Sequence, residues 1–171
     1  AERRNFPVAS LRAISSARSA GKTVLFKGKP VTVEMLTEES FDGIDIAFFS
    51  AGSDLSLEFV PIAQKAGAVV IDNSPAFRMR DDVPLVIPEI NGPDVSSHRG
   101  IIANPNCTAA VALMAIFPLH RAFGLRRVIA SSYQAVSGTG ARAIVELREQ
   151  VAAAAANQML APQVYPHPIA F

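Results

Sequence analysis

The chain has 171 residues, of which half are hydrophobic and 18% are charged, as is typical of a packed globular protein and not of a disordered one. Sixteen basic and fifteen acidic side chains leave a net charge of +1, which provides no electrostatic surface for nucleic acid or an anionic membrane. No apolar stretch reaches the roughly 18–20 residues that a membrane span needs, so neither nucleic acid nor a membrane is an expected partner.

The first part of the chain has the pattern of short strands joined by turns. A strand is expected over 10–16 and is followed by a turn over 17–22. Two β-patterned runs, 23–26 and 31–35, flank the Lys-Gly-Lys sequence at 27–29. This spacing predicts a β-hairpin.

Apolar runs alternate with helical patterns through the middle of the chain. The run 44–49 is nearly continuous, as in a parallel strand that is buried on both faces, and 55–66 has helical spacing with Gly67 at its end. Further short strands are expected at 68–71, 85–87 and 101–103. The alternation predicts an α/β fold with a mainly parallel sheet and flanking helices.

The last part of the chain combines two helical patterns with one more strand-like run. A helix is expected over 109–119, a strand over 127–133, and a long helix over 141–157 after a glycine-containing turn at 137–140. Three charged residues of the long helix, Glu146, Arg148 and Glu149, are expected on its solvent-facing side.

Small or polar turns follow several of the predicted strands. Ligands of parallel α/β sheets bind beyond the carboxyl ends of the strands. The four turns that could therefore surround one crevice lie at 50–52, 73–74, 104–107 and 134–140.

The single cysteine, Cys107, has no disulfide partner within the chain, which is consistent with a reducing compartment. It follows an apolar strand and a proline-containing turn, and it precedes a helical pattern. The free N–H groups and the dipole of a helix N-terminus favour thiolate over thiol. A lone cysteine is usually inert packing, but one at a polar strand-to-helix turn is a candidate nucleophile.

The Pro-Asn-Cys sequence at 105–107, together with Tyr-Gln-Ala-Val-Ser-Gly-Thr-Gly at 133–140, resembles aspartate-semialdehyde dehydrogenases. Less specific matching stretches lie in the same order at 15–22, 44–52, 70–74, 77–78 and 83–91. The resemblance implies part of an NADP-binding Rossmann-like domain over 1–106. It also implies the start of an α+β catalytic and dimerisation domain over 107–171.

The resemblance implies a reaction and a cellular setting as well as a fold. The implied reaction is NADPH-dependent reductive dephosphorylation of β-aspartyl phosphate to aspartate β-semialdehyde through a thioacyl-enzyme. This reaction lies at the branch toward lysine, threonine, methionine and isoleucine. The implied assembly is a homodimer or a dimer of dimers, located in the cytoplasm or, in a plant or alga, in the plastid stroma.

The resemblance also implies roles for individual residues. Cys107 resembles the nucleophile, and Gln134 resembles the residue that orients the acyl group of the substrate. Arg78 resembles the phosphate-binding arginine, and Asn106 lies in the substrate and phosphate pocket. The cofactor-binding residues implied are Ser16, Arg18, Ser19, Ser50, Ala51, Gly52, Asn73, Ser137 and Gly138. No metal-binding set is expected.

Several of these residues also have a simpler interpretation. Arg78 has Arg80 nearby, and a solvated basic loop explains the pair about equally well. The turn at 137–140 could be only a helix cap, because Thr139 is a good capping residue. The role of Gln134 rests almost wholly on the resemblance.

The resemblance predicts a partial chain. The family opens with a strand and a glycine-rich phosphate loop before the position of Ala1. Its general-base histidine, its substrate-binding glutamate and arginine, and most of its dimerisation sheet lie beyond the segment that 165–171 resembles. We therefore expect the 171-residue chain to be inactive alone. Two alternatives are a non-catalytic paralogue that binds nucleotide weakly or pairs with a full-length subunit, and a related acyl-phosphate reductase such as the N-acetylglutamyl-phosphate type.

Overall fold

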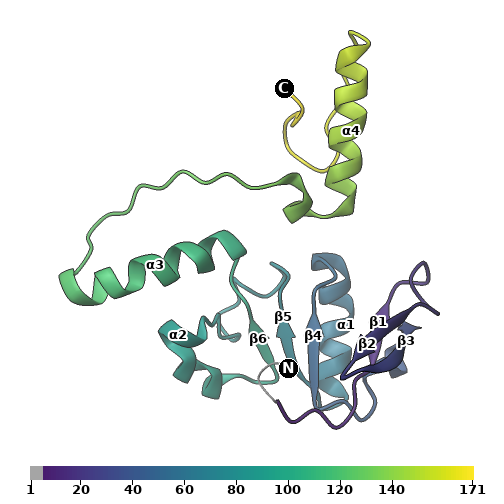
Figure 1. Cartoon of the computed structure of the whole chain (residues 1–171). Helices are drawn as coiled ribbons and strands as arrows, with labels where there is room; N and C mark the ends of the chain where they lie inside the picture. The colour runs from purple at the N-terminus through teal and green to yellow at the C-terminus, as the bar shows by residue number, and fades with distance from the viewer. Residues whose placement is uncertain (1–5) are drawn as a thin grey trace. The chain divides into compact units, whose positions relative to one another are not determined.

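The computed structural model of the chain describes residues 6–171. The chain divides into two compact units, Ala1–Gly124 and Leu125–Phe171 (Figure 1). No helix among the described residues is both long enough and apolar enough to cross a membrane.

The first unit contains a parallel sheet of three strands. These are β4 (Ile46–Phe49), β5 (Val69–Asp72) and β6 (Ile101–Ala103), and they lie in that order across the sheet. Their register pairs Phe49 with Asp72 and Asp72 with Ala103, so the three carboxyl ends are level at one edge. The predicted α/β fold with a mainly parallel sheet is confirmed, and this edge is the position at which such folds bind ligands.

A second, mixed sheet in the same unit has the order β1-β3-β2. It consists of β1 (Ala13–Ser15), β2 (Thr23–Phe26) and β3 (Lys29–Met35). The predicted hairpin is confirmed, and β3 begins two residues earlier than expected, at Lys29. Its turn residues Lys27 and Gly28 have φ angles of 49° and 73°, the left-handed conformations that a tight two-residue hairpin turn requires.

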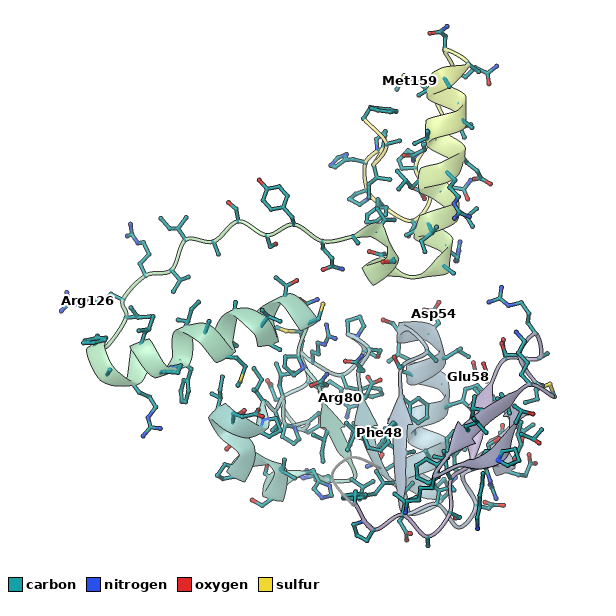
Figure 2. All side chains as sticks on the ribbon, in the orientation of Figure 1. Phe48, Asp54, Glu58, Arg80, Arg126 and Met159 are labelled. Carbon is teal, nitrogen blue, oxygen red and sulfur yellow. The ribbon has the colours of Figure 1, made fainter. Side chains whose placement is uncertain are left out.

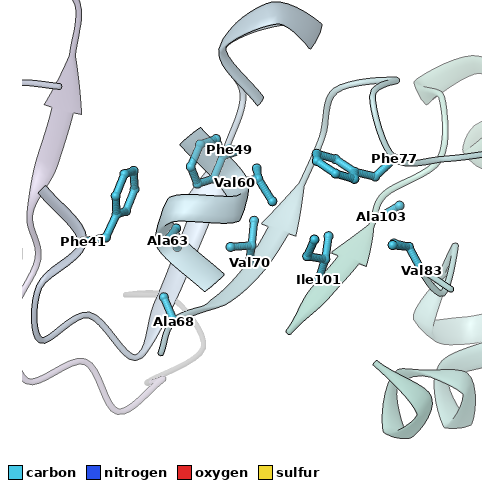
Figure 3. Close-up of a cluster of buried hydrophobic side chains, with 11 residues drawn as sticks. Phe41, Phe49, Val60, Ala63, Ala68, Val70, Phe77, Val83, Ile101 and Ala103 are labelled. Carbon is cyan, nitrogen blue, oxygen red and sulfur yellow. The ribbon is translucent and has the colours of Figure 1, made fainter. Parts of the chain in front are cut away.

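Helix α1 (Ser53–Lys65) covers one face of the parallel sheet. Its residues Val60 and Ala63 are fully buried and belong to the same cluster as Val70 of β5 (Figure 3). Phe41, in the short 3-10 helix η2 (Glu38–Phe41), stacks on Phe49 with 5.6 Å between ring centroids. The exposed face of α1 carries Asp54 and Glu58, one helical turn apart (Figure 2). The buried cluster between α1 and the sheet holds in place the strand ends that carry the candidate site.

The strand predicted at 85–87 does not form, and only Leu85 makes a single parallel bridge, to Ala103. The side chain of Asn91, in the short helix α2 (Pro88–Asn91), takes up backbone groups of 85–87 that a strand would pair with its neighbour. Its side-chain oxygen accepts from the N–H of Ile87 at 2.8 Å, and its side-chain nitrogen donates to the carbonyl of Leu85 at 2.9 Å. The 3-10 helix η3 (Gly92–Ser97) then leads back to β6.

The second unit is built on helix α4 (Ala141–Ala155), which follows the 3-10 helix η4 (Val136–Thr139). The predicted long helix is thus confirmed but ends two residues early, and Asn157 has a φ of 55°. The strand predicted at 127–133 is wrong. This segment has no regular structure, and Ile129 and Tyr133 are 89% and 100% exposed. A strand needs a neighbour for its backbone hydrogen bonds, and the structure gives this segment none.

The prediction that Glu146 lies on the solvent face of α4 is also wrong, because this residue is only 6% exposed. Its carboxylate accepts hydrogen bonds from the backbone N–H groups of Gln163 and Val164 and from the side chain of Gln150. The side-chain oxygen of Gln150 accepts in turn from the N–H groups of Ile169 and Ala170. The C-terminal segment has irregular structure, so side chains of α4 supply the acceptors that its backbone needs. Arg148 and Glu149 are exposed, as predicted.

Candidate active site

Three of the four predicted strand-end turns lie at the same edge of the parallel sheet. The turns 50–52, 73–74 and 104–106 directly follow β4, β5 and β6, whose ends are level. The fourth turn, 134–140, belongs to the second unit. The first unit alone therefore brings together the candidate residues of the turns after β4, β5 and β6.

Cys107 is the first residue of helix α3 (Cys107–Phe123), as the sequence predicts, and its side chain is exposed. Asn106 is the N-cap of this helix. Its side-chain oxygen accepts from the backbone N–H groups of Thr108 at 2.9 Å and Ala109 at 3.3 Å. Such a cap contributes about 1 kcal/mol to helix stability. An exposed thiol at a capped helix N-terminus is accessible for chemistry, and it is not a packing residue.

Arg78 joins the turn after β5 to the turn after β6. Its Nε donates to the carbonyl of Asn104 at 2.8 Å, and one Nη donates to the carbonyl of Asn73 at 3.0 Å. The side chains of Asn104 and Asn73 are themselves bonded at 2.6 Å. Arg78 is thus a fixed part of the strand-end edge and does not belong to a solvated loop.

Arg80 differs from Arg78 although it lies only two residues away. It forms an exposed ion pair with Asp82, with bonds of 2.9 and 2.6 Å, which Figure 2 locates by the Arg80 label. The hydrogen bond from Arg80 lowers the pKa of Asp82 and raises the pKa of Arg80 itself. Arg80 therefore provides a matched comparison for Arg78.

We expect Arg78→Ala to speed hydrogen exchange of the backbone N–H of Asn104 about 10-fold, because the carbonyls of Asn73 and Asn104 lose the donor that they share. This backbone N–H donates to the carbonyl of Asp72 at 2.8 Å, so its exchange rate reports on the junction between the turns after β5 and β6. Arg80→Ala removes only a surface ion pair and should change this rate by no more than about threefold. Equal effects of the two variants would show that Arg78 does not hold the turns.

Asp72 is a site residue that no sequence pattern singled out. It ends β5, and its side chain is fully buried. Its carboxylate accepts from the hydroxyl of Ser56 in α1 at 2.9 Å, and from the N–H and hydroxyl of Ser74 at 3.1 and 2.6 Å. The sequence pattern that could have predicted it is an acidic residue at the end of an apolar strand. A carboxylate buried there is costly unless it is hydrogen-bonded, so such a residue indicates partners nearby.

The turn 50–52 leads from β4 into α1, and all three of its residues are exposed. Gly52 is the N-cap of the helix with a φ of 87°, a conformation that other residues rarely adopt. Its carbonyl accepts from the N–H of Ser56 at 3.1 Å. Helix α1 therefore begins directly after the turn that follows β4, so its N-terminus lies at the strand-end edge.

The predicted cofactor residues Ser16, Arg18 and Ser19 lie in a turn after β1. Ser16 and Arg18 are exposed, and the carbonyl of Ser16 accepts from the N–H groups of Ser19 and Ala20 at 2.9 and 3.1 Å. The described hydrogen bonds of this turn are with itself and with β3, so they do not connect it to the turns after β4, β5 and β6.

In the second unit, Gln134, Ser137 and Gly138 lie together at η4. The N–H of Gly138 donates to the carbonyl of Ala135 at 2.9 Å, and the side chain of Gln134 lies against Gly138. Gly140, not Thr139, caps α4. The hydroxyl of Thr139 is instead bonded to that of Tyr165 at 2.7 Å. The structure thus groups these three predicted residues in one turn.

Within residues 6–171, the structure brings together no group of three or more histidine, cysteine, aspartate or glutamate side chains that could hold a metal ion. The polar groups at the strand-end turns are serine hydroxyls, asparagine amides, the Arg78 guanidinium, the Cys107 thiol and the buried Asp72 carboxylate, whose described bonds are to serines. This set is suited to binding anions and acyl groups.

Two protein-family models match the chain. Residues 1–98 match the model described as "Semialdehyde dehydrogenase, NAD binding domain", and residues 116–171 match "Semialdehyde dehydrogenase, dimerisation domain". The first match covers more than half of the chain and includes the turns after β4 and β5. It shows a domain that binds a nicotinamide cofactor.

Curated relatives carry the name of the family that the sequence resembles. The chain is 48% identical to the aspartate-semialdehyde dehydrogenase of Bacillus subtilis over 165 residues, which are 96% of the chain and 48% of that protein. It is 51% identical to the enzyme of Aquifex aeolicus over 174 aligned residues, which cover 99% of the chain and 51% of that protein. The chain therefore spans about half the length of these relatives.

A solved structure shares both fold and sequence with the chain. The crystal structure of aspartate semialdehyde dehydrogenase II from Vibrio cholerae matches with a TM-score of 0.81 and 42% identity, covering 99% of this chain and 51% of that one. A second structure of that enzyme, described as complexed with ASA, matches with a TM-score of 0.82. The resemblance stated from the sequence is confirmed.

Proposed function

The chain belongs to the semialdehyde dehydrogenase family, and from this premise we propose that it is part of an aspartate-semialdehyde dehydrogenase. The proposed reaction is the NADPH-dependent conversion of β-aspartyl phosphate to aspartate β-semialdehyde and phosphate, in the biosynthesis of lysine, threonine, methionine and isoleucine. The observation that carries the proposal is the exposed Cys107 thiol at the N-terminus of α3, with the helix capped by Asn106.

In the proposed mechanism, the thiolate of Cys107 attacks the acyl carbon of β-aspartyl phosphate. The bond from that carbon to the phosphate oxygen breaks, phosphate leaves with the electron pair, and a thioester forms on Cys107. When bound, NADPH supplies the hydride that reduces this thioester. The thiolate of Cys107 then leaves, and aspartate β-semialdehyde is released.

The other side chains have supporting roles in this proposal. The backbone N–H of Cys107 is the proposed donor to the oxyanion, and Gln134 orients the acyl group. Arg78 binds the phosphate with the part of its guanidinium that does not hold the turns. Asn106 is proposed to line the phosphate and substrate pocket. It also supports this pocket indirectly, because its cap fixes the start of α3 and thus the position of Cys107.

The proposed cofactor site is assembled from the strand-end turns. The exposed turn 50–52, with its left-handed Gly52, and Asn73 are proposed to line the cofactor at this edge. Ser16, Arg18 and Ser19 are proposed to bind the 2′-phosphate that distinguishes NADP from NAD, because a guanidinium with hydroxyls suits a phosphate. A related structure from Candida albicans, 26% identical to this chain, is described as containing NADP.

We propose that residues 1–106 contribute to the NADP-binding domain and that 107–171 begin the catalytic and dimerisation domain. The match of residues 116–171 to a dimerisation-domain model supports an assembly of two copies, as a homodimer or a dimer of dimers. This division differs from the boundary between the compact units at Gly124, because α3 packs with the first unit while carrying the catalytic thiol at its start.

The proposal is tested by assaying NADPH formation from aspartate semialdehyde, NADP and phosphate. We expect a full-length enzyme that carries this sequence to turn over, and we expect no turnover from the 171-residue chain alone. The reason is that the histidine and the glycine-rich loop on which the family relies match no residue of this chain. Turnover by the isolated chain at the full-length rate would overturn the second expectation. A full-length enzyme that reduces only a different acyl phosphate would overturn the first.

A further inference from the structure

We infer that Gly138 is a positioning residue that forms the seat for the carboxamide of Gln134, and this inference rests on the proposed function. The two residues lie four positions apart on either side of the turn that begins η4, within the second unit. A Cβ atom at position 138 would lie 2.9 Å from Cδ and 3.2 Å from Cγ of Gln134, and closer still to its Nε2. The side chain of Gln134 thus occupies the space that any residue other than glycine would need.

The backbone at position 138 does not itself require glycine. Eight of the ten glycines have φ angles in the left-handed region, where a side chain is strained whatever space surrounds it, and Gly92 and Gly138 do not. A Cβ at Gly92 would meet no atom within 4 Å, whereas the three atoms nearest to a Cβ at Gly138 would all belong to the side chain of Gln134. The side chain of Gln134 is therefore the group that a side chain at position 138 would displace.

The turn that contains Gly138 is stabilised by two backbone hydrogen bonds and by one side-chain hydrogen bond to the C-terminal segment. The N–H of Gly138 donates to the carbonyl of Ala135 at 2.9 Å, and the N–H of Gly140 donates to the carbonyl of Ser137 at 3.1 Å. The hydroxyl of Tyr165 bonds that of Thr139 at 2.7 Å. A methyl group at position 138 is thus accommodated by movement of the flexible, exposed end of Gln134 and not by movement of the backbone.

The seat gives Gly138 an effect on the reaction that is separate from cofactor binding. The proposed role of Gln134 is to orient the acyl group, and a misplacement of about 1 Å in such a residue can cost up to about 100-fold in rate. If Gly138 acts through Gln134, its replacement should lower kcat and leave the KM for NADPH unchanged. A residue that only lines the cofactor site would show the opposite pattern.

The structural test uses the 171-residue chain and the side-chain amide signals of its glutamines in ¹⁵N–¹H NMR spectra. Gln134→Ala identifies the signal pair of Gln134 by its loss. We expect Gly138→Ala to shift this pair while the melting temperature stays within about 2 °C of the parent value. Gly92→Ala, at the glycine with ordinary φ and open surroundings, should leave the pair in place. An unshifted Gln134 pair in Gly138→Ala would overturn the inference.

The kinetic test uses the same changes in a full-length enzyme that carries this sequence. Gly138→Ala should lower kcat about 10- to 100-fold, and it should cause no further loss when Gln134 is already alanine. A raised KM for NADPH with kcat retained would overturn the inference, because Gly138 would then act on the cofactor. If Gln134→Ala alone leaves kcat unchanged, the proposed role of Gln134 fails, whereas the NMR result still decides whether the seat exists.

Discussion

Cys107→Ala is expected to lower kcat/KM about 10⁴-fold or more in a full-length enzyme that carries this sequence. The thiolate is the only proposed group that forms a covalent bond with the substrate, so its loss removes the pathway and not merely part of the stabilisation of one step. Cys107→Ser should be nearly as severe, because a serine hydroxyl is a far weaker nucleophile without a base arranged to activate it. The measurement is the rate of NADPH formation from aspartate semialdehyde, NADP and phosphate.

The matched control for this variant is Val111→Ala on the same helix. Val111 is 74% exposed, one turn beyond Cys107, and a surface substitution of this kind should change the rate by no more than about twofold. Both proteins should retain the helix content of the parent in far-UV circular dichroism spectra. A Cys107→Ala enzyme with more than a tenth of the parent activity would contradict the nucleophile assignment.

Asp72→Ala is expected to destabilise the parallel sheet by about 3 kcal/mol. The buried carboxylate of Asp72 accepts from two serine hydroxyls and one backbone N–H, and the alanine variant leaves these donors buried without acceptors. Each unsatisfied buried group costs about 1–3 kcal/mol, and partial relaxation of the serine side chains reduces the sum. The measurement is native-state hydrogen exchange of the β4 and β5 amides, which reports the opening free energy of this sheet.

Two variants separate the hydrogen-bond network from a general effect of removing a carboxylate. Asp72→Asn keeps the shape and one acceptor oxygen, and it should cost about 1–2 kcal/mol. Asp81→Ala removes an exposed carboxylate in the same unit, and it should change the opening free energy by no more than about 0.5 kcal/mol. If Asp72→Ala proves as mild as Asp81→Ala, the network does not hold the strand-end turn.

The parallel sheet was predictable because its strands are continuous apolar runs that end in small or polar turns. Such runs are typical of parallel strands. The expectation that the run 44–49 is buried on both faces is wrong, however, because Ala47 and Phe49 of β4 are buried whereas Ile46 and Phe48 are 40% and 76% exposed. The position of Cys107 at a helix start followed from the same alternation. The turns after β4, β5 and β6 then had to share one edge, since the strands run parallel.

The errors arise where long-range partners decide the outcome. The run 127–133 has the composition of a strand, but a strand forms only beside a neighbour, and the sequence does not show whether one is present. Glu146 has the spacing of a surface residue, and its burial depends on a segment that begins 17 residues later. The bonds from Arg78 to the carbonyls of Asn73 and Asn104 are likewise invisible to any local pattern.

The site could be predicted only in part for a related reason. Motif spacing singled out Cys107 as the candidate nucleophile, and the structure places it beside Asn106 at a helix N-terminus. No pattern singled out Asp72 as the support of the turn after β5, because its partner Ser56 is 16 residues distant. Gln134 and Gly138 are only four residues apart, but their contact depends on the conformation of the turn between them, which the sequence pattern does not predict.

The central claim is that Cys107 carries the acyl group, and mass spectrometry of the trapped enzyme tests it most directly. A full-length enzyme that carries this sequence would be mixed with aspartate semialdehyde and NADP in the absence of phosphate, then quenched in acid and digested. Hydride transfer without phosphate to release the product should leave one aspartyl group on the Cys107 peptide as a thioester, with about one NADPH formed per active site. NADPH formation with an unmodified Cys107 peptide, or an aspartyl group on another residue, would contradict the account.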